Sequence, residues 1–345
     1  MRKPDPRGKG GSRRGATPAE FPTCPPEPED EVLRGNGGCV KRFTSIAALT
    51  AILITTAACG DDTASTDTEP ADSASPETTS ADTVPVGDYP QAIISLSPTA
   101  TEMLFAIGAG DQIIAVDEFS NYPAEALEKP NDLSGFEPNV EAIAALEPDL
   151  VIMQDPTIQE QLEALGIPVW IGSAATSFDD VYTQIEQLGA ATGHIAEAAE
   201  LVAQMQTDIE AAVAAATIPE AGLSYYHELD PTLYSLTSNT FAGQVYSVFG
   251  LTNIADTAEP GNDYPQLNAE YIATANPDLI FLADTKCCGE SPETVAARPG
   301  WDGIAAVQNG AIVAIDDDIA SRWGPRIVEF IEAVSAAIQT VQANA

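Results

Sequence analysis

Two glutamates occupy matching positions in two similar stretches of the chain. Glu141 begins the run EAIAALEPDLVIM, and Glu270 begins the run EYIATANPDLIFL. In both runs the same spacing leads from the glutamate to a Pro-Asp pair, and an apolar segment follows. The helix dipole favours a carboxylate in the first turn of a helix, which is one explanation for either residue. Their matched placement also indicates that the chain contains two similar lobes.

Positive charge is scarce in this chain, which has a formal net charge of −38 and 14 Lys and Arg residues among 345. A charge of this sign argues against nucleic acid or an anionic membrane surface as a partner. Nine of the 14 basic residues precede residue 59. The remaining ones are Lys129, Lys286, Arg298, Arg322 and Arg326. Each of these either has a specific binding role or pairs with a neighbouring carboxylate.

Arg322 and Arg326 follow the apolar run AIVAI, with Trp323 between them. Ligands of parallel α/β sheets bind beyond the carboxyl ends of the strands. We therefore expect at least one of the two guanidinium groups to face a ligand and to donate charge-assisted hydrogen bonds to a carboxylate. Other residues that follow predicted strands are Ser97, Glu118, Phe119, Tyr122, Gln154, Ser173 and Lys286.

His227 and Glu228 lie together at the end of another predicted strand, in the run YYHELD. A histidine beside a carboxylate is the pair that metal insertion into a ring would require, and this is the only local candidate. The chain contains two histidines, whereas sites for free zinc or manganese usually need several. We find no nucleophile elbow, phosphate loop or zinc motif. We therefore expect neither an enzyme nor a resident metal or cofactor.

The first 88 residues divide by composition into three segments. Residues 1–39 are rich in Gly, Pro and Arg without apolar periodicity, so we expect them to be disordered; a translation start at Val40 would remove them. Residues 40–58 have a basic start and a mostly apolar core that ends in small residues, as in an export signal. Residues 59–88 carry only acidic charges among Ser, Thr, Ala and Pro, which is typical of a flexible tether.

Cys59 directly follows the signal-like segment and is the candidate for lipid attachment. Small residues before a cysteine at the end of an export signal resemble a bacterial lipobox, although Thr56 stands where leucine is usual. The alternatives are an ordinary signal peptide that is cut nearby and an uncleaved anchor. Acylation of Cys59 would attach the protein to the outer face of the cell membrane.

Cys287 and Cys288 are adjacent and follow the apolar run LIFLAD. Export would place them in an oxidising compartment, with only each other as intramolecular partners once Cys59 is acylated. We predict a disulfide between them that shapes the rim of the ligand cleft and has no catalytic role. The alternative is a pair of free thiols packed as small apolar groups.

A long helical run over residues 194–217 divides the folded part of the chain. Ile195, Ala198, Val202 and Met205 recur at steps of three and four, which predicts one apolar helix face. Pro219 ends the run, because the residue before a proline avoids the helical region. The predicted domains are therefore an N-terminal lobe over 89–193, the linking helix over 194–217, and a C-terminal lobe over 218–345.

Short apolar strands alternate with helical segments on both sides of the linking helix, which predicts parallel sheets covered by helices. The predicted strands are 92–96, 112–116, 150–153, 168–171, 223–228, 233–236, 279–283 and 311–315. The predicted helices are 99–110, 139–147, 157–165, 241–249, 268–275, 292–297 and 325–342. The expected fold class is α/β, with two Rossmann-like lobes whose mainly parallel sheets are bridged by a single long helix.

The motifs SPTATEML, NVEAIAALEPDLV and SRWGPR occur in this order over residues 91–340. In sequence and spacing they resemble the substrate-binding proteins of bacterial ABC importers for ferric siderophores, haem and cobalamin. The resemblance implies that a ligand binds in a cleft between two lobes. It also implies docking onto permease subunits through one glutamate per lobe, Glu141 and Glu270. Aromatic cleft residues of the cobalamin-binding members correspond to Tyr122 and Tyr264.

The function expected from this resemblance is capture of an iron complex outside the cell and its delivery to an ABC permease. Arg322 and Arg326 beside Trp323 favour an anionic ferric siderophore, because arginine suits a carboxylate. The expected ligand contacts are Ser97, Phe119, Tyr122, Tyr264, Lys286, Arg322, Trp323 and Arg326. Cobalamin or haem are the alternatives within the same family, and a chelatase-like enzyme is the alternative outside it. We expect a monomer.

Overall fold

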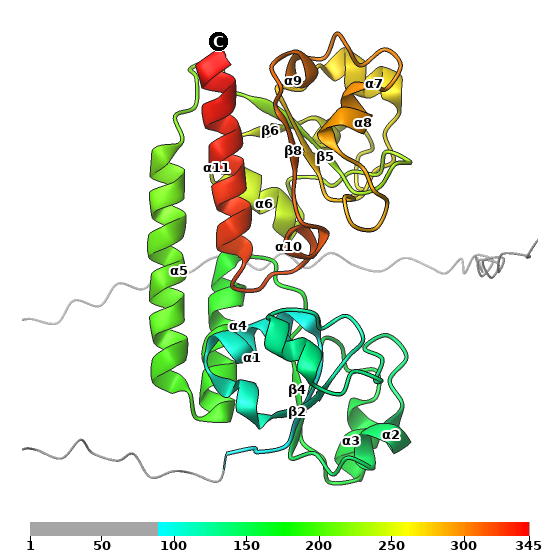
Figure 1. Ribbon diagram of the computed structural model, residues 1–345, viewed down its shortest axis with the longest axis vertical. Coiled ribbons are helices and arrows are strands. Elements are labelled where there is room, and N and C mark those ends of the chain that lie inside the picture. Colours follow the sequence, from blue (N-terminus) through cyan, green and yellow to red (C-terminus); the bar gives the residue numbers. More distant parts are fainter. Residues whose placement is uncertain (1–88, 345) are drawn as a thin grey trace, which may run out of the picture. The chain divides into compact units, whose positions relative to one another are not determined.

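Two four-stranded sheets, each entirely parallel, form the framework of the protein (Figure 1). The computed structural model describes residues 89–344, so the predictions for residues 1–88, including lipidation of Cys59, lie outside the described residues. A single long helix joins the two lobes, which confirms the predicted fold class.

The N-terminal sheet has the strand order β2-β1-β3-β4. Its strands are β1 (Ile93–Leu96), β2 (Ile113–Val116), β3 (Leu150–Met153) and β4 (Val169–Ile171). The central strands β1 and β3 are buried at every residue, because helices cover both faces of a parallel sheet. Ile93 pairs with Leu150 in this sheet, and Leu96 pairs with Met153, so that both strands end at the same edge.

The C-terminal sheet repeats this arrangement in the order β6-β5-β7-β8. Its strands are β5 (Ser224–Glu228), β6 (Thr252–Asn253), β7 (Leu279–Leu282) and β8 (Ile312–Ala314). The strand predicted over 233–236 is wrong: Tyr234 makes only an isolated bridge, to Gln266. The physical reason is the backbone of Leu233, which has φ of 71° and forms a turn that donates to the carbonyl of Asp230.

Helices cover both faces of the sheets. In the N-terminal lobe they are α1 (Pro98–Ala106), α2 (Val140–Ala144), α3 (Gln159–Ala164) and α4 (Phe178–Thr192). The linking helix is α5 (Ile195–Ala215). The remaining helices are α6 (Phe241–Ser247), α7 (Ala269–Ala275), α8 (Pro292–Ala296), α9 (Ala305–Gln308), α10 (Asp317–Ser321) and α11 (Ile327–Asn344). The sequence analysis did not predict β6, α4, α9 or α10.

The linking helix packs against α4 along its first half and against α11 along its second half (Figure 1). Ala198, Val202 and Met205 are its buried residues, as the apolar periodicity predicted. A hydrogen bond of 2.7 Å from Ser335 Oγ to the carbonyl of Ala212 joins α11 to α5. The C-terminal helix therefore supports the second half of the linking helix. Among the described residues no helix is both long and apolar enough to cross a membrane.

The Pro-Asp pairs of the two similar stretches serve the same structural purpose. Asp149 Oδ2 accepts hydrogen bonds from the backbone N–H groups of Gln91 and Ala92, just before β1. Asp278 Oδ2 accepts from the N–H and the hydroxyl of Ser224, the first residue of β5. In each lobe the chain thus fixes the start of the first strand with an aspartate that directly precedes the third.

The residue before each Pro-Asp pair adopts the left-handed backbone region. Glu147 has φ of 50°, and Asn276 has φ of 51°. Such a residue reverses the chain direction at the end of a helix and lets the following proline lead into the next strand. The resemblance between the two stretches therefore extends from composition to backbone conformation.

Candidate functional site

Two cavities lie at the carboxyl ends of the two sheets and share Ser321 and Trp323. The N-lobe cavity has a volume of about 420 Å³. Its N-lobe lining comes from Leu96, Pro98, Thr99, Asp117, Phe119, Gly135, Phe136, Gln154 and Asp155. The C-lobe cavity has a volume of about 610 Å³. Its lining includes Ala174, Ala175, Thr176, Phe241, Asp263, Tyr264, Cys287 and Asp317.

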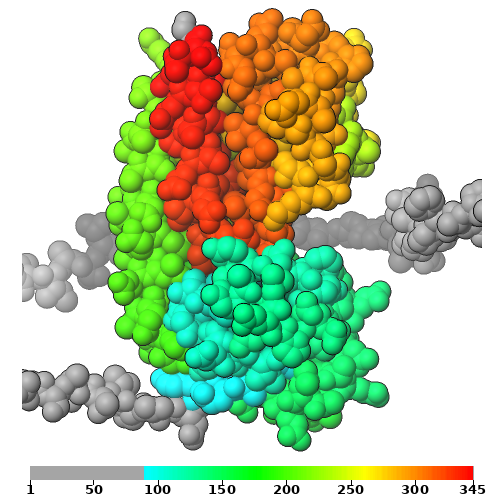
Figure 2. Space-filling view, in the orientation of Figure 1, coloured from blue at the N-terminus to red at the C-terminus, as the bar shows by residue number. Residues whose placement is uncertain are grey.

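Both cavities are bounded by both lobes, so together they are the candidate ligand cleft. Figure 2 shows the lobes in contact, with the orange segment that precedes α11 against the N-terminal lobe. Trp323 belongs to this segment, and its indole Nε1 donates to Gln184 Oε1 of α4 at 3.2 Å. These cavities lie at the strand ends of both sheets, where the sequence analysis expected a ligand cleft.

Two large aromatic side chains are exposed in the lining of the N-lobe cavity. Phe119 and Phe136 contact each other edge to face, with ring centroids 5.5 Å apart. They are 49% and 80% exposed, which is unusual for side chains of this size. Phe136 was not among the predicted contacts, although it precedes Glu141 by only five positions.

The C-lobe cavity also has an aromatic lining, and it draws on both lobes. Tyr264 is 55% exposed and lines this cavity, in agreement with its expected position. Phe241 of α6 lies 5.8 Å, between ring centroids, from Phe178 of α4. Gln244 of α6 donates a side-chain hydrogen bond to the carbonyl of Thr176. The unpredicted helix α4 thus brings the N-terminal lobe against the C-lobe cavity.

Arg322 lines the N-lobe cavity, but the protein already occupies its terminal donors. Nη1 donates to Glu102 Oε1 at 2.8 Å and to Asn121 Oδ1 at 3.0 Å. Nη2 donates to the carbonyl of Phe119 at 3.0 Å and to Asp318 Oδ1 at 2.8 Å. A guanidinium group has four terminal N–H donors, so none of these is free for a ligand carboxylate.

Arg326 is likewise paired within the protein. Its Nε donates to Glu102 Oε2 at 2.9 Å, and its guanidinium carbon lies 4.2 Å from the ring centroid of Tyr122. Glu102 is 3% exposed and lies in α1, so it binds arginines that come from the opposite end of the chain. The bonds to Glu102 raise the pKa of Arg326, although burial lowers it.

Tyr122 and Arg326 line a third cavity instead of the cleft. This cavity has a volume of about 810 Å³ and lies between α1, α5 and the start of α11. Acidic side chains surround it, among them Glu125, Glu128 and Glu329. The largest of these three cavities therefore does not lie at the strand ends, where parallel α/β sheets bind their ligands. The structure separates Tyr122 from Tyr264, which the resemblance had assigned to one cleft.

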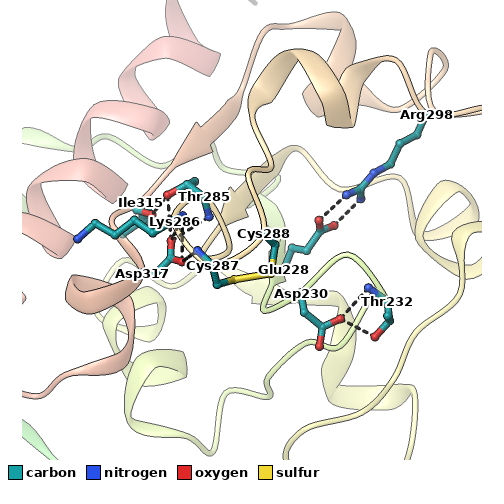
Figure 3. Close-up of a disulfide and its surroundings, with 10 residues drawn as sticks. All are labelled: Glu228, Asp230, Thr232, Thr285, Lys286, Cys287, Cys288, Arg298, Ile315 and Asp317. Atoms are coloured by element: carbon teal, nitrogen blue, oxygen red, sulfur yellow. Dashed lines mark hydrogen bonds and ion pairs between the residues drawn. A yellow bond between two sulfur atoms is a disulfide. The ribbon is translucent and has the colours of Figure 1, made fainter. Parts of the chain in front are cut away.

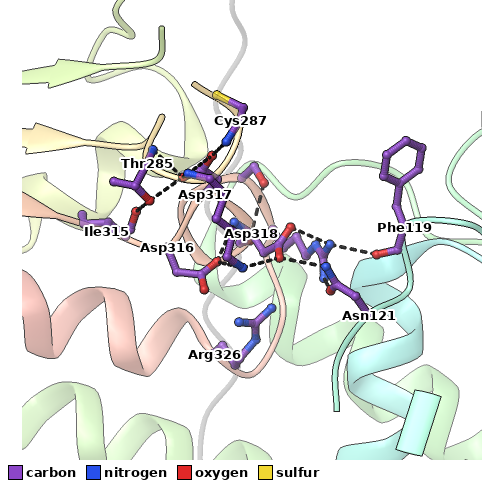
Figure 4. Close-up of polar contacts among 12 residues, drawn as sticks. Phe119, Asn121, Thr285, Cys287, Ile315, Asp316, Asp317, Asp318 and Arg326 are labelled. Atoms are coloured by element: carbon purple, nitrogen blue, oxygen red, sulfur yellow. Dashed lines mark hydrogen bonds and ion pairs between the residues drawn. The ribbon is translucent and has the colours of Figure 1, made fainter. Parts of the chain in front are cut away.

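Lys286 is held by the acidic start of α10. Its Nζ lies 2.7 Å from Asp316 Oδ1 and 2.8 Å from Asp318 Oδ2. Asp318 also accepts from Asn121 of the N-terminal lobe, at 3.0 Å (Figure 4). Burial raises the pKa of Asp318, but the bonds from Lys286, Asn121 and Arg322 outweigh burial and hold that pKa below its usual value.

Cys287 and Cys288 are joined by a disulfide in the structure, and Cys287 lines the C-lobe cavity (Figure 3). The carboxylate of Asp317 accepts from the backbone N–H groups of Thr285, Lys286 and Cys287, at 2.8, 3.0 and 2.8 Å. The loop after β7 is therefore wrapped around one aspartate of α10. This arrangement fixes the rim of the cavity from two sides.

His227 and Glu228 lie in the core of the C-terminal lobe and not in the cleft, with both residues 0% exposed. His227 Nδ1 is 2.6 Å from the hydroxyl of Tyr246, and burial lowers the pKa of His227 to about 3. Glu228 is bound by Arg298, which lies over the ring of Trp301. Strand β5 places both side chains in the core. The hypothesis that this pair contacts a ligand is therefore wrong.

Glu141 and Glu270 occupy equivalent positions in their helices. Each is the second residue of a short helix, α2 or α7, and each side chain is exposed. Asn139 caps the first helix, and its Oδ1 accepts from the N–H of Glu141 at 3.0 Å. Asn268 caps the second helix by accepting from Tyr271 N–H at 2.9 Å. Both glutamates lie outside the two cleft cavities.

Ser97 is buried and performs a structural task, because its hydroxyl caps α1 by accepting from the N–H of Ala100. The sequence analysis missed Glu102, Asp318 and Phe241. Glu102 lies within the quoted motif SPTATEML, yet nothing in one sequence indicates that its partners are more than 200 residues away.

The family model described as periplasmic binding protein matches residues 93–319. The chain is 31% identical to an uncharacterised ABC transporter substrate-binding lipoprotein of Bacillus subtilis, over 74% of this chain and 82% of that protein. It is 31% identical to a cobalamin-binding protein of Halobacterium salinarum, over 70% of this chain and 67% of that protein. A crystal structure of a possible iron-binding protein from Staphylococcus epidermidis superposes with a TM-score of 0.62 at 25% identity, covering 72% of this chain and 99% of that one.

Proposed function

Because the chain belongs to the periplasmic binding protein family, we propose that it captures a corrinoid of the cobalamin type outside the cytoplasm and delivers it to an ABC permease. The observation that carries this ligand class is the lining of the cleft. Large aromatic side chains line both cavities, and the one cation that lines them, among residues 89–344, is Arg322. The terminal donors of Arg322 are occupied by protein acceptors.

A large and nearly neutral ligand suits such a lining. Phe119, Phe136, Tyr264 and Trp323 offer flat apolar surfaces for the faces of a macrocycle. Two exposed acids of the same cavities, Asp155 and Asp263, provide acceptors for peripheral amide N–H groups. The cobalamin-binding relative from Halobacterium supports the same ligand class.

A ferric siderophore is the second candidate. The sequence favoured it because at least one of Arg322 and Arg326 was expected to face the cleft, and their pairing with Glu102 removes that reason for an anionic ligand. A neutral or cationic ferric complex remains compatible with the aromatic lining. The possible iron-binding relative from Staphylococcus supports this candidate.

Delivery of the ligand requires residues that dock onto a permease and a location of the protein outside the cytoplasm. We infer that Glu141 and Glu270 are the docking residues, because both are exposed, lie outside the cleft cavities, and occupy equivalent positions in the two lobes. Cys59 remains the proposed site of lipid attachment. Mass spectrometry of the protein isolated from its natural membrane is expected to find an acylated cysteine at the mature N-terminus; an unmodified N-terminus at another residue would contradict this.

The ligand is tested by fluorescence titration of the purified protein with cyanocobalamin, a neutral ferric trihydroxamate, ferric citrate and haemin in parallel. We expect saturable quenching by cyanocobalamin, and weaker binding of the anionic ferric citrate. Trp323→Ala is expected to lower corrinoid affinity at least tenfold, because it removes a wall shared by both cavities. Trp170→Phe, outside the two cavities, is the matched control. Tight binding of a ferric complex without corrinoid binding would establish the second candidate instead.

A further inference from the structure

One buried carboxylate, Glu102, balances two arginines, Arg322 of the N-lobe cavity and Arg326 of the third cavity. The side chain of Glu102 is 2% exposed, and those of Arg322 and Arg326 are 9% and 10% exposed. Its two oxygens accept from Arg322 Nη1 and from Nε and Nη2 of Arg326. Both guanidinium groups therefore share one carboxylate as their ion-pair partner.

The groups around Arg322 sum to no net charge. Arg322 and Arg326 contribute two positive charges, and Glu102 and Asp318 contribute two negative charges. Asp318 additionally binds Lys286, which also binds Asp316 (Figure 4). Arg322 therefore reaches the N-lobe cavity without presenting a positive potential there.

We propose that Glu102 is a specificity-determining residue that makes the cleft select against anionic ligands. It acts through Arg322, because it consumes the donors and the charge with which this arginine would bind an anion. This proposal rests on the proposed function only in the choice of two corrinoids as test ligands. The charge that Glu102 imposes on the cleft is measurable without any ligand.

A purely structural role for Glu102 makes a different prediction. An inter-lobe ion pair that only supports folding would, when weakened, lower the affinity for all ligands by the same factor. A residue that sets the local charge changes the affinity for anionic ligands relative to neutral ones. The ratio of two affinities therefore separates these roles, whereas a single affinity does not.

The ligand-free test uses the fluorescence of Trp323, which is adjacent to Arg322 and lines both cavities. A Trp170→Phe background isolates this residue, because Trp301 is 1% exposed and inaccessible to quenchers. Quenching is measured with iodide, an anion, and with acrylamide, a neutral molecule. In Glu102→Gln we expect the ratio of iodide to acrylamide quenching to rise about twofold or more, because the local charge increases by one unit.

The ligand test uses cyanocobalamin and its monocarboxylic acid, in which one peripheral amide is replaced by a carboxylate. The two probes have nearly the same shape and differ by one negative charge. The original protein is expected to prefer the neutral probe, and Glu102→Gln is expected to reduce that preference about fivefold. Glu102→Asp retains the charge and should retain the preference. Glu160→Gln removes an exposed carboxylate of α3, outside the three cavities, and controls for net charge.

Asp318→Asn provides a second variant if Glu102→Gln does not fold. It removes the other carboxylate partner of Arg322, at a position whose side chain is 20% exposed. For Asp318→Asn we expect the same rise in the ratio of iodide to acrylamide quenching and the same reduction in the preference for the neutral corrinoid. Iodide and acrylamide quenching that keep the original ratio in the folded variants would overturn the proposal. A raised quenching ratio in a protein that binds neither corrinoid would support it and contradict only the proposed ligand.

Discussion

Burial decides the role of each polar residue near the strand ends. In the sequence, Arg322 follows a predicted strand and His227 lies at the end of another. Both were therefore candidates for contact with a ligand. In the structure Arg322 reaches the N-lobe cavity, whereas His227 is enclosed by Tyr246 and Phe330 in the core. For these two residues the direction of the side chain, and not the position relative to a strand, decides which one lines a cavity.

Acid is expected to destabilise the protein through His227. Its folded pKa of about 3 lies below the ordinary value of 6.5. Between these values the unfolded chain binds one more proton, so the free energy of unfolding falls as pH falls, by about 1.4 kcal/mol per pH unit. His227→Gln keeps a polar partner for Tyr246 and cannot titrate. Urea unfolding at pH 7, 6 and 5 should show that the stability difference between the original and the variant changes below pH 6.5. An equal difference at pH 5 and pH 7 would contradict this assignment.

The two lobes repeat one structural element in which an aspartate joins the third strand to the start of the first. The repeat comprises a capping asparagine, an exposed glutamate, a left-handed residue and the Pro-Asp pair. The bonds of Asp278 to Ser224 are partly buried, whereas those of Asp149 to the residues before β1 are exposed. The same element is therefore expected to contribute differently to the stability of the two lobes.

Asp278→Ala is expected to lower the free energy of unfolding by about 1–3 kcal/mol, because two donors of Ser224 lose their acceptor. Asp149→Ala should cost less, since water replaces its exposed bonds. Chemical unfolding of both variants checks the order, and Glu220→Ala at an exposed loop position is the control. A larger effect at Asp149 than at Asp278 would show that burial of these bonds does not determine their contribution.

The loop after β7 is expected to depend on its disulfide. Without reductant, iodoacetamide should leave Cys287 and Cys288 unmodified even in denaturant, and two adducts should appear after reduction. The Cys287→Ser, Cys288→Ser double variant is expected to bind ligand several-fold more weakly, because the rim of the C-lobe cavity loses a covalent constraint. Intact mass and the fluorescence titration measure the two effects. Rapid alkylation of Cys287 and Cys288 in the unreduced native protein would exclude the disulfide.

At the scale of the whole molecule, ligand and permease are expected to use different surfaces. The cleft cavities lie at the strand ends of both lobes, and the exposed glutamates lie at the starts of α2 and α7. This separation allows a loaded protein to dock without exposing the ligand first.

Glu141→Ala combined with Glu270→Ala is therefore expected to abolish uptake while ligand affinity changes less than twofold. Exposed carboxylates on other helices, removed in Glu160→Ala with Glu293→Ala, provide the matched control. Uptake is measured in cells that carry the cognate permease, and affinity is measured on the purified variants. A loss of ligand binding in the isolated double variant would contradict the docking role.

The sequence by itself determined the fold class, the linking helix and most strands, because these depend on local periodicity and on helix and strand endings. Strand β3 coincides with its prediction, and α5 differs from it by one residue at the start and two at the end. The matched glutamates and the adjacent cysteines were also visible as local patterns. The family membership followed from motifs that are contiguous in the chain.

Only the tertiary structure decided which candidate residues share a site. Glu102 and Arg326 are separated by 224 positions, and their contact depends on how α11 returns to the N-terminal lobe. That contact neutralises the arginines from which an anionic ligand was expected, and it assigns Tyr122 to the cavity beside α5. The electrostatic environment and the burial of a side chain depend on its neighbours in space. These neighbours cannot be read from the order of residues along the chain.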